Sequence, residues 1–436
     1  MRIHFIGIGG IGMSSLAQYY HEKGHQVFGS DLVSSEITDL LKEMGIGIAI
    51  GQYEQNIKED FDLVIYSPAV PAENPEYKRA LELDLRIQSY PEALGELTKQ
   101  YFTIAVSGSH GKSTTTALIS LILVKAKLDP TVILGTKLKE FGDSNFRMGK
   151  SNFLVIEACE YDDSFNNYQP KITVVTNIDK EHLDYFKTFA NVVKAFKKFI
   201  LKLPEDGFLV ANKDDLGIKK AINSKFSFSN KFLIKQFSIK HPDAKKLRKI
   251  LRIPGDHNVS NALASLEVAR ILNVKDEISF KALSEYRGSW RRFEIKEGHA
   301  EKKHIIIVSD YGHHPNEVSA TLIATREKYP KKKIWLVYQP HQYQRTHYLF
   351  SDFVKVFRGA KIDEILITEI YDVAGREEKQ ISSSVSSESL VKKINKKNVR
   401  YMSFELVENF IKENIKAGDI LVVMGAGDIY KLAEKF

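Results

Sequence analysis

Apolar and polar positions along this chain change in blocks that predict strands and helices in turn. Short apolar runs at residues 3–8, 63–66 and 172–175 have the length and composition of buried strands. Residues 12–23 carry apolar side chains three and four positions apart, which indicates a helix. Strands that alternate with helices are typical of domains with a parallel sheet. The pattern therefore predicts an α/β fold.

The strand–helix rhythm begins three times, so we expect three domains. They are a Rossmann-like domain at residues 1–96, a central P-loop ATPase-like domain at 97–294 and a second Rossmann-like α/β domain at 295–436. A helix should begin within 254–261, after a polar, lysine-rich stretch. Further strands are expected at residues 26–29, 153–156, 304–308, 334–338, 364–368 and 420–424.

The central domain opens with a phosphate-binding loop, in which an apolar strand runs into Gly-Ser-His-Gly-Lys-Ser at 108–113 and a threonine-rich helix follows. Backbone N–H groups at a helix start favour anionic oxygens, Lys112 can reach the β- and γ-phosphates, and the Ser113 hydroxyl can bind Mg²⁺. An ordinary glycine turn is the alternative, but strand, loop and helix stand in the required order. The residues expected to bind ATP here are Gly108, Ser109, His110, Gly111, Lys112, Ser113 and Thr114.

A second glycine-rich motif stands near the start of the chain. Residues 7–12 are Gly-Ile-Gly-Gly-Ile-Gly, and Asp31 follows nineteen residues later. Glycines at this spacing let the backbone approach a pyrophosphate, and the acid can bind ribose hydroxyls. Because the chain has two phosphate motifs, we expect one nucleotide ligand as a substrate and a second consumed as ATP. The first ligand would contact Gly7, Gly9, Gly10, Ile11, Gly12 and Asp31.

Two further side chains follow strands of the central domain. Glu157 follows the strand at 153–156, and His182 lies in the polar segment 177–184 after the next strand. Neighbouring strand ends can bring a carboxylate and an imidazole, together with Ser113, to one Mg²⁺. The alternative is a helix-capping glutamate and an ordinary surface histidine. The nearby phosphate loop favours the metal site.

The third domain places polar motifs after its strands at 310–315 and 339–346. Their histidine spacing matches no common zinc arrangement, whereas Arg345 could bind a carboxylate with two hydrogen bonds. Arg292, at the junction of the second and third domains, could reach a transferring phosphate or could be a solvated arginine. The side chains expected on a substrate-binding surface are Tyr311, His313, His341 and Arg345.

The composition is that of a slightly basic globular protein. Its 436 residues include 63 Lys and Arg against 55 Asp and Glu, a formal net charge of +8. The densest lysine run, 240–249, lacks interleaved aromatic residues, so we expect a solvated face and no nucleic-acid partner. One cysteine excludes an intramolecular disulfide and fits the cytoplasm. The N-terminus lacks a cleavage pattern, so no signal peptide is expected. The chain has no run of 18 apolar residues, so no membrane partner is expected. The oligomeric state stays open between monomer and dimer.

In the order and spacing of these motifs, the chain resembles the Mur ligases, ATP-dependent amide-forming enzymes of peptidoglycan precursor synthesis. The resemblance covers essentially the whole chain, and it is strongest for the branch that joins L-alanine to UDP-N-acetylmuramate. It rests on the residues at 7–12, 108–116, 157–160, 177–184, 255–261, 291–293, 310–315, 339–341 and 425–428.

The resemblance implies one domain each for the UDP-sugar, ATP and the amino acid. It implies that ATP phosphorylates the lactyl carboxylate of UDP-N-acetylmuramate and that the amine of L-alanine attacks this acyl phosphate, giving an amide, ADP and phosphate. Lys112 and Arg292 would act on the phosphates, and Asp310 would bind the ATP ribose. The implied ligand sets are Ser113, Glu157 and His182 for Mg²⁺, His257, Asn258 and Asn261 for adenine, and Tyr311, His313, His341 and Arg345 for the amino acid.

Three positions depart from the family pattern. Cys159 stands where an aspartate is usual, but Glu157 is intact, so we expect activity to persist. Gln342 replaces an arginine that is common after Gln-Pro-His, which bears on the choice of amino acid. Phe196 stands where some Mur ligases carry a carbamylated lysine, and Lys197 is one residue away.

Four other functions compete with alanine addition. A murein tripeptide ligase would act on the same UDP-sugar. The spacing after His182 and the Glu-Tyr-Asp at 160–162 favour this alternative. The motifs at 310–315 and 339–346 favour L-alanine. An NAD-dependent oxidoreductase would not need the loop at Lys112. A non-catalytic nucleotide-binding regulator would lack the metal ligands, and a nucleic-acid-dependent ATPase would need clustered basic residues.

Overall fold

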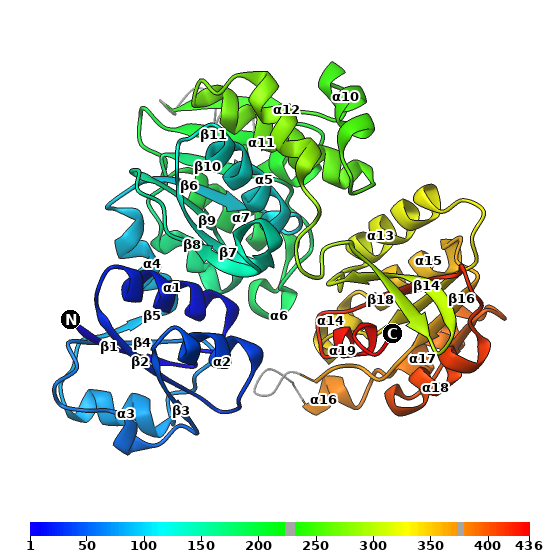
Figure 1. Ribbon diagram of the computed structural model, residues 1–436, viewed down its shortest axis with the longest axis horizontal. Helices are drawn as coiled ribbons and strands as arrows, with labels where there is room; N and C mark the ends of the chain where they lie inside the picture. Colours follow the sequence, from blue (N-terminus) through cyan, green and yellow to red (C-terminus); the bar gives the residue numbers. More distant parts are fainter. Residues whose placement is uncertain (223–231, 373–378) are drawn as a thin grey trace. The chain divides into compact units, whose positions relative to one another are not determined.

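The structure is a computed structural model that describes residues 1–222, 232–372 and 379–436. It contains three β-sheets (Figure 1), as the predicted α/β fold requires. By its internal contacts the chain forms two compact units. Unit 1 comprises residues 1–178, 193–238 and 264–282 and holds two sheets, and unit 2 comprises 179–192, 239–263 and 283–436 and holds the third. The domain boundaries at 96/97 and 294/295 stay predictions.

The first sheet of unit 1 has five parallel strands in the order β3-β2-β1-β4-β5. Its central strand ends at Ile6 and not at the predicted Ile8, because Gly7 turns the backbone to a φ of 81°. The loop after this strand therefore lies at the middle of the carboxyl edge, where ligands of such sheets bind. The elements are β1 (Arg2–Ile6), α1 (Ile11–Glu22), β2 (Gln26–Asp31), α2 (Glu36–Glu43), β3 (Gly47–Ile50), η1 (Glu54–Asn56), β4 (Leu63–Tyr66), α3 (Pro75–Glu82), β5 (Ile87–Ser89) and α4 (Tyr90–Thr98).

The second sheet of unit 1 has seven strands in the order β12-β11-β10-β6-β9-β7-β8, all parallel except the β7–β8 pair. The lysine-rich stretch left unassigned by the hydrophobic pattern contributes two of these strands, β11 and β12. The elements are β6 (Phe102–Ser107), α5 (Lys112–Lys125), β7 (Thr131–Leu138), η2 (Lys139–Phe141), β8 (Ser144–Arg147), β9 (Phe153–Glu157), η3 (Tyr161–Asn167), β10 (Ile172–Val175), α7 (Phe189–Ile200), β11 (Phe208–Asn212), α8 (Leu216–Ala221), β12 (Leu233–Phe237), α11 (Asp256–Ile271) and α12 (Asp276–Glu285). Helices α7, α11 and α12 have residues in both units.

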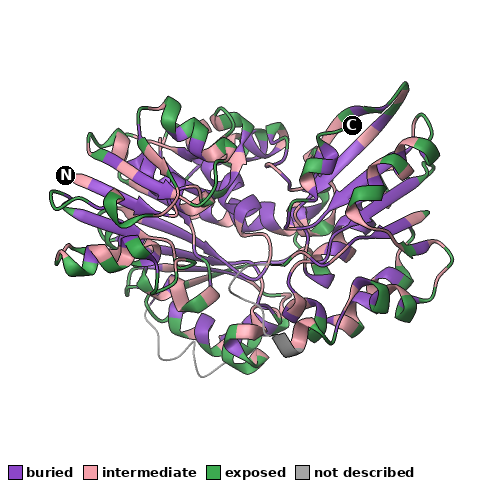
Figure 2. Ribbon diagram, turned by 90° about the horizontal axis from the view of Figure 1, so that it is seen from below, coloured by how far each residue is buried: buried purple, intermediate pink, exposed green. Residues whose placement is uncertain are grey.

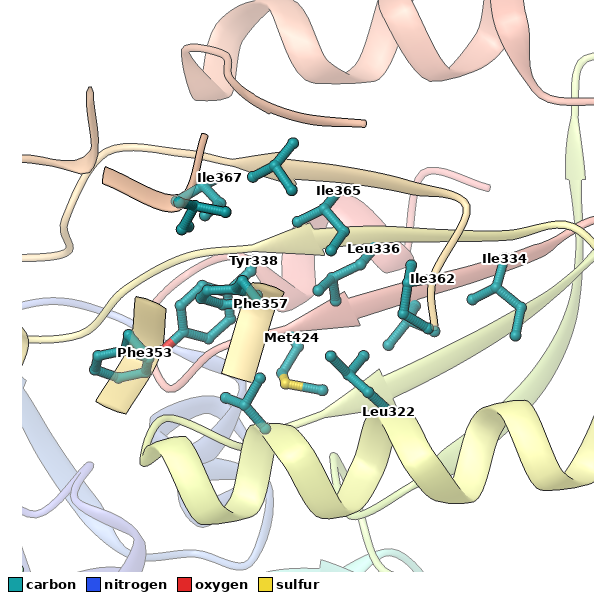
Figure 3. Packing of buried hydrophobic residues seen from close by; sticks show 14 of the residues in the cluster. Leu322, Ile334, Leu336, Tyr338, Phe353, Phe357, Ile362, Ile365, Ile367 and Met424 are labelled. Carbon is teal, nitrogen blue, oxygen red and sulfur yellow. The ribbon is translucent and has the colours of Figure 1, made fainter. Parts of the chain in front are cut away.

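The sheet of unit 2 has six strands in the order β13-β14-β18-β15-β16-β17, parallel except for the β13–β14 hairpin. Its core packs strand side chains against α13 and α15, as Figure 3 shows for Leu336, Tyr338 and Phe357. The ring centroids of Tyr338 and Phe357 are 5.2 Å apart. The elements are α6 (Leu183–Phe186), α10 (Pro242–Ile250), β13 (Glu294–Ala300), β14 (Lys303–Asp310), α13 (Pro315–Lys328), β15 (Ile334–Tyr338), α14 (Tyr343–Tyr348), α15 (Phe350–Gly359), β16 (Glu364–Ile367), α16 (Lys379–Ser382), α17 (Ser387–Ile394), β17 (Val399–Tyr401), α18 (Phe404–Asn414), β18 (Ile420–Met424) and α19 (Tyr430–Ala433).

One buried side chain of β8 joins the two sheets of unit 1. The Asn145 amide donates to the Ile11 carbonyl at 2.6 Å and accepts from Gln18 Nε2 at 3.0 Å. The Asn145 carbonyl accepts from the Ser15 hydroxyl at 3.1 Å. Asn145 is 4% exposed, and buried amides in proteins are nearly always hydrogen-bonded. Helix α1, which follows the first glycine loop, is thereby fixed to the second sheet.

The lysine-rich helix α10 has the solvated face that the sequence predicts. Lys245, Lys246 and Lys249 are exposed, whereas Ala244 and Leu247 are buried. Figure 2 shows the same division elsewhere, with mostly buried strands and helices exposed on one side. Within the three described segments, no helix has both the length and the apolar character that a membrane crossing requires.

Candidate active site

The phosphate-binding loop of unit 1 has the predicted strand–loop–helix order. β6 ends at Ser107, and α5 begins at Lys112. Gly108 and Gly111 have φ angles of 139° and 83°, which only glycine adopts without strain. A Cβ on Gly108 would also stand 2.0 Å from the Thr176 hydroxyl oxygen. The glycines are therefore needed for the path of the loop, which ends at the first turn of α5, where backbone N–H groups favour an anion.

The end of β10 fixes this loop from the neighbouring strand. Ser109 N donates to the Asn177 carbonyl at 3.1 Å, and His110 N donates to Asn177 Oδ1 at 2.9 Å. The backbone N–H groups of Ser109 and His110, two residues predicted to bind ATP, are thus hydrogen-bonded within the protein. In this structure these bonds shape the loop. Thr114 lies in the first turn of α5 and is buried. Asn177 therefore shapes the loop, and the sequence located it only as part of a polar segment.

Lys112 is held at the base of the loop by a buried carboxylate. Its Nζ donates to the Gly108 carbonyl at 2.6 Å and to Glu160 Oε2 at 2.9 Å. The Glu160 side chain is fully buried, and that of Lys112 is 17% exposed. Burial alone would lower the pKa of Lys112, but the charge of Glu160 outweighs it and raises this pKa above its usual value. Lys112 is therefore a fixed cation, and Glu160 is the partner that the sequence did not identify.

Two of the three predicted metal ligands meet beside this lysine. The Ser113 hydroxyl donates to Glu157 Oε2 at 3.0 Å, and the Gly135 N–H binds the other oxygen of Glu157. A hydroxyl next to a carboxylate is a donor set that suits Mg²⁺. His182 lies in unit 2, where it precedes α6 with a φ of 54°. Its part in the metal site stays a prediction.

Two departures from the family pattern also lie in unit 1. Cys159, two residues beyond the end of β9, is exposed. The Phe196 side chain is buried, with its ring centroid 5.3 Å from that of Phe165. Position 196 is therefore part of the hydrophobic core, and the half-buried Lys197 follows it on α7.

The first glycine loop is held by the strand next to it. Gly7 N and Ile8 N both donate to the Ser30 carbonyl at 2.9 Å, and Gly9 N donates to Asp31 Oδ2 at 2.8 Å. A Cβ on Gly9 would lie 2.8 Å from that same oxygen. Asp31 therefore shapes the loop in this structure. Gly10, Ile11 and Gly12 continue it into α1, and contacts of the six predicted residues with a UDP-sugar stay predictions.

In unit 2, Asp310 organises the segment that carries the arginine pair. Its carboxylate accepts from Phe293 N at 2.8 Å, Gly312 N at 2.9 Å and the Thr321 hydroxyl at 3.2 Å. Burial raises the pKa of Asp310, although Arg292 and the backbone donors oppose the rise. Both carboxylate oxygens thus accept bonds within the unit. The predicted contact of Asp310 with the ATP ribose stays a prediction.

The two arginines of the pair have different surroundings. Arg291 is buried, donates to the Gly427 carbonyl at 3.0 Å, and lies 4.5 Å from the Tyr430 ring centroid. Arg292 is half-buried over the Tyr311 ring at 4.8 Å. Arg291 is therefore the one that fixes the chain, which leaves Arg292 as the candidate for contact with phosphate.

The residues predicted to bind adenine lie in the first turns of α11. Asn258 and Asn261 are buried, and Asn258 Nδ2 donates to the Pro254 carbonyl at 2.7 Å. Gly255 has a φ of 98°, which sets the entry to the helix. Burial lowers the pKa of His257 to about 4, so its imidazole is neutral near pH 7. Contacts of these residues with adenine stay predictions.

The four residues predicted to bind the amino acid form one group in unit 2. His313 Nδ1 lies 3.1 Å from the Tyr311 carbonyl, and the His313 and His341 ring centroids are 5.9 Å apart. Arg345 Nη1 donates to His341 Nδ1 at 3.0 Å. Burial lowers the pKa of His313 to about 4 and, with the charge of Arg345, that of His341 to about 2. Both imidazoles are therefore neutral, and His341 can accept the bond from Arg345.

A glutamate that the sequence did not single out completes this group. Arg345 donates to Glu181 Oε1 from Nη2 at 2.9 Å and from Nε at 3.1 Å. Burial would raise the pKa of Glu181, but the charge of Arg345 holds it well below its usual value. Gln342 precedes α14 with a φ of 68° and lines the small cavity beside this pair. An acid that directly precedes the predicted metal ligand His182 is the signal that could have identified Glu181.

Comparison with known proteins gives one consistent result. Family models match as "Mur ligase family, catalytic domain" at residues 2–102, "Mur ligase middle domain" at 106–269 and "Mur ligase, glutamate ligase domain" at 291–427. The UDP-N-acetylmuramate–L-alanine ligase of Caldanaerobacter subterraneus is 42% identical over 100% of this chain and 97% of that protein. The protein of the same name from Clostridium kluyveri is 38% identical with the same coverage.

The fold also matches a solved structure of a protein with the same name as these relatives. The crystal structure of UDP-N-acetylmuramate-alanine ligase MurC from Thermotoga maritima matches with a TM-score of 0.81 and 27% identity, over 100% of this chain and 98% of that one. The sequence matches extend across all three sheets. The chain therefore belongs to the Mur ligase family.

Proposed function

We propose that this protein is an ATP-dependent ligase that joins L-alanine to the lactyl carboxylate of UDP-N-acetylmuramate, a step of peptidoglycan precursor synthesis. The observation that carries the proposal is full-length similarity, at 38–42% identity, to relatives named for this reaction. The two glycine loops of unit 1 support it, because this reaction uses one nucleotide as a sugar carrier and another as the phosphoryl donor.

In the first step, ATP transfers its γ-phosphoryl group to the lactyl carboxylate, which becomes an acyl phosphate. Negative charge on the transferring oxygens must be stabilised, and a fixed cation does so more effectively than a mobile one. Lys112 is such a cation, since Glu160 and the Gly108 carbonyl hold its Nζ at the start of α5. The ATP phosphates would compete with Glu160 for this ammonium.

A divalent cation, which we propose to be Mg²⁺, would neutralise charge on the ATP phosphates. Ser113 and Glu157 would hold it, and the 3.0 Å between their oxygens fits the donor spacing of one ion. His182 is the proposed third ligand. The Ser113 hydroxyl now donates its proton to Glu157, so a bound ion would redirect this hydroxyl to offer a lone pair.

In the second step, the amine of L-alanine attacks the acyl carbon, and phosphate leaves. The amine attacks only as the neutral base, and its alignment with the acyl carbon decides the rate. We propose that Tyr311, His313, His341 and Arg345 hold the amino acid. The low pKa values of His313 and His341 keep both imidazoles uncharged, so they offer hydrogen bonds without repelling a substrate cation.

We further propose that the protein works in the cytoplasm. ATP and nucleotide sugars are substrates of that compartment, and the single Cys159 fits its reducing conditions.

The test of the proposed function is phosphate release from Mg-ATP and UDP-N-acetylmuramate with different acceptors. L-Alanine, L-serine, glycine and the tripeptide L-Ala-γ-D-Glu-meso-diaminopimelate are tried separately, and the product is identified by mass. We expect phosphate release and an amide product with L-alanine. Release with the tripeptide alone would make the protein a murein tripeptide ligase, and no release with any acceptor would refute the proposal.

A further inference from the structure

Arg345, the arginine proposed to bind the carboxylate of the amino acid, already binds a carboxylate of its own chain. Its Nη2 and Nε both donate to Glu181 Oε1, at 2.9 and 3.1 Å. The Arg345 side chain is 8% exposed and that of Glu181 is 4% exposed. Hydrogen bonds between a guanidinium and a carboxylate are among the strong ones in proteins. This buried pair therefore governs what else Arg345 can bind.

The other donors of Arg345 are also engaged. Nη1 donates to His341 Nδ1 at 3.0 Å and to the His341 carbonyl at 3.2 Å. A guanidinium has five N–H groups, and these four bonds leave one of them. In this state Arg345 cannot bind a second carboxylate through two parallel hydrogen bonds, which is the arrangement that gives arginine its selectivity for carboxylates.

The space beside the pair is correspondingly small. The cavity has room for about one water molecule, ≈ 10 Å³. An amino acid cannot enter it unless a side chain moves. The residues that line it include Lys180, Glu181, His182, Gln342, Arg345 and Tyr348.

We propose that Glu181 is an internal substitute for the substrate carboxylate, which occupies Arg345 until L-alanine arrives and displaces it. The inference rests on the proposed function. Glu181 is suited to displacement because Arg345 binds only Oε1, whereas the buried Oε2 has no hydrogen-bond partner among the described residues. A substrate carboxylate that engages Arg345 through both oxygens would bind it better. Lys180, exposed at the same cavity, offers a solvated cation for the released carboxylate.

The test is the KM for L-alanine of the Glu181→Gln variant. Glutamine keeps the shape and the hydrogen-bond acceptor but removes the charge, and a neutral acceptor holds an arginine about half as strongly. The internal competitor is thus weakened, and we expect the KM for L-alanine to fall about tenfold. L-Alaninamide has no carboxylate to place on Arg345, so its KM should be the same in both proteins, as should the KM for Mg-ATP.

An unchanged or raised KM for L-alanine in Glu181→Gln would overturn the inference and make Glu181 only a structural partner of Arg345. A fall for L-alaninamide equal to that for L-alanine would also overturn it. Asp363→Asn is the matched control, because Asp363 pairs with Arg326 at 2.6 Å in the same unit and does not line the cavity; its KM should match the wild type.

Two further measurements keep the test decisive. If Glu181→Gln does not fold, Glu181→Asp replaces it. The aspartate keeps the charge, but its side chain is shorter and reaches Arg345 less well. A KM for L-alanine below that of the wild type is therefore again expected. The wild-type protein separates the inference from the proposed function. A wild type that uses no acceptor contradicts the function, whereas a wild type that turns over L-alanine with the same KM as the variant contradicts only the role of Glu181.

Discussion

Replacing Lys112 by methionine should destabilise unit 1 as well as stop the reaction. Methionine keeps most of the length of the side chain and removes its charge, which leaves the fully buried Glu160 without its cation. Removing one partner of a buried ion pair costs about 3–5 kcal/mol. Because 17% of the Lys112 side chain is exposed, we place the loss in free energy of unfolding at the low end, about 3 kcal/mol.

The double variant Lys112→Met/Glu160→Gln separates the two effects. With the charge of Glu160 also removed, only an incompletely bonded amide remains, so the loss should shrink to about 1 kcal/mol. Activity should not return, because the transferring phosphoryl group still lacks its cation. Loss of such a group lowers the rate about a thousandfold, which corresponds to about 4 kcal/mol of transition-state stabilisation.

The assays are urea unfolding followed by fluorescence, and phosphate release at saturating Mg-ATP, UDP-N-acetylmuramate and L-alanine. Binding of UDP-N-acetylmuramate is the internal control, because its predicted site is the loop after β1 and should be unaffected. Wild-type stability of Lys112→Met would refute the claim that Glu160 depends on this lysine. Recovery of turnover in the double variant would refute the role of Lys112 in phosphoryl transfer.

Three more predictions concern the metal, the loop and the pH dependence. Ser113→Ala should raise the Mg²⁺ concentration for half-maximal turnover by about tenfold or more, measured by adding Mg²⁺ back after chelation; an unchanged requirement would exclude Ser113 as a ligand. Gly108→Ala should abolish ATP binding in calorimetry, because the new Cβ would stand 2.0 Å from the Thr176 hydroxyl. The control variant Gly359→Ala has open space around the new Cβ and should bind ATP normally. The pKa of His313 falls from 6.5 to about 4 on folding, so the unfolded chain binds more protons between these values. The free energy of unfolding should therefore drop by about 3 kcal/mol as the pH falls from 6.5 to 4. Thermal unfolding of His313→Asn should show a shallower drop, and an equal drop would contradict the lowered pKa of His313.

The strands that pattern reasoning located best are the continuously apolar ones. β4, β10, β15 and β18 have the expected bounds because central parallel strands are buried on both faces. β11 and β12 were not expected, since lysines and short apolar runs conceal their period, and β8 lies in an antiparallel pair without a marked alternation. The glycine loops were predictable because their turns at Gly7, Gly108 and Gly111 have positive φ angles that favour glycine.

The partners of the functional side chains were less predictable than the side chains themselves. Glu160, Glu181 and Asn177 all lie in polar segments that the sequence located after strands, yet none was assigned a role. Their importance depends on contacts between residues 48 to 164 positions apart, such as Lys112 with Glu160 and Arg345 with Glu181. A pattern of neighbouring residues contains no information on such distant pairs, whereas the strand ends on which they lie can be read from it.

The Asn145 side chain limits how this protein can be divided into pieces. A fragment cut at residue 96 would carry α1 but lose β8, so Ser14 and Gln18, both buried now, would face water without the amide that binds them. A chimaera that exchanges only residues 1–96 would keep these bonds only where the recipient has an amide at the same place. A fragment that keeps these hydrogen bonds therefore extends at least through β8.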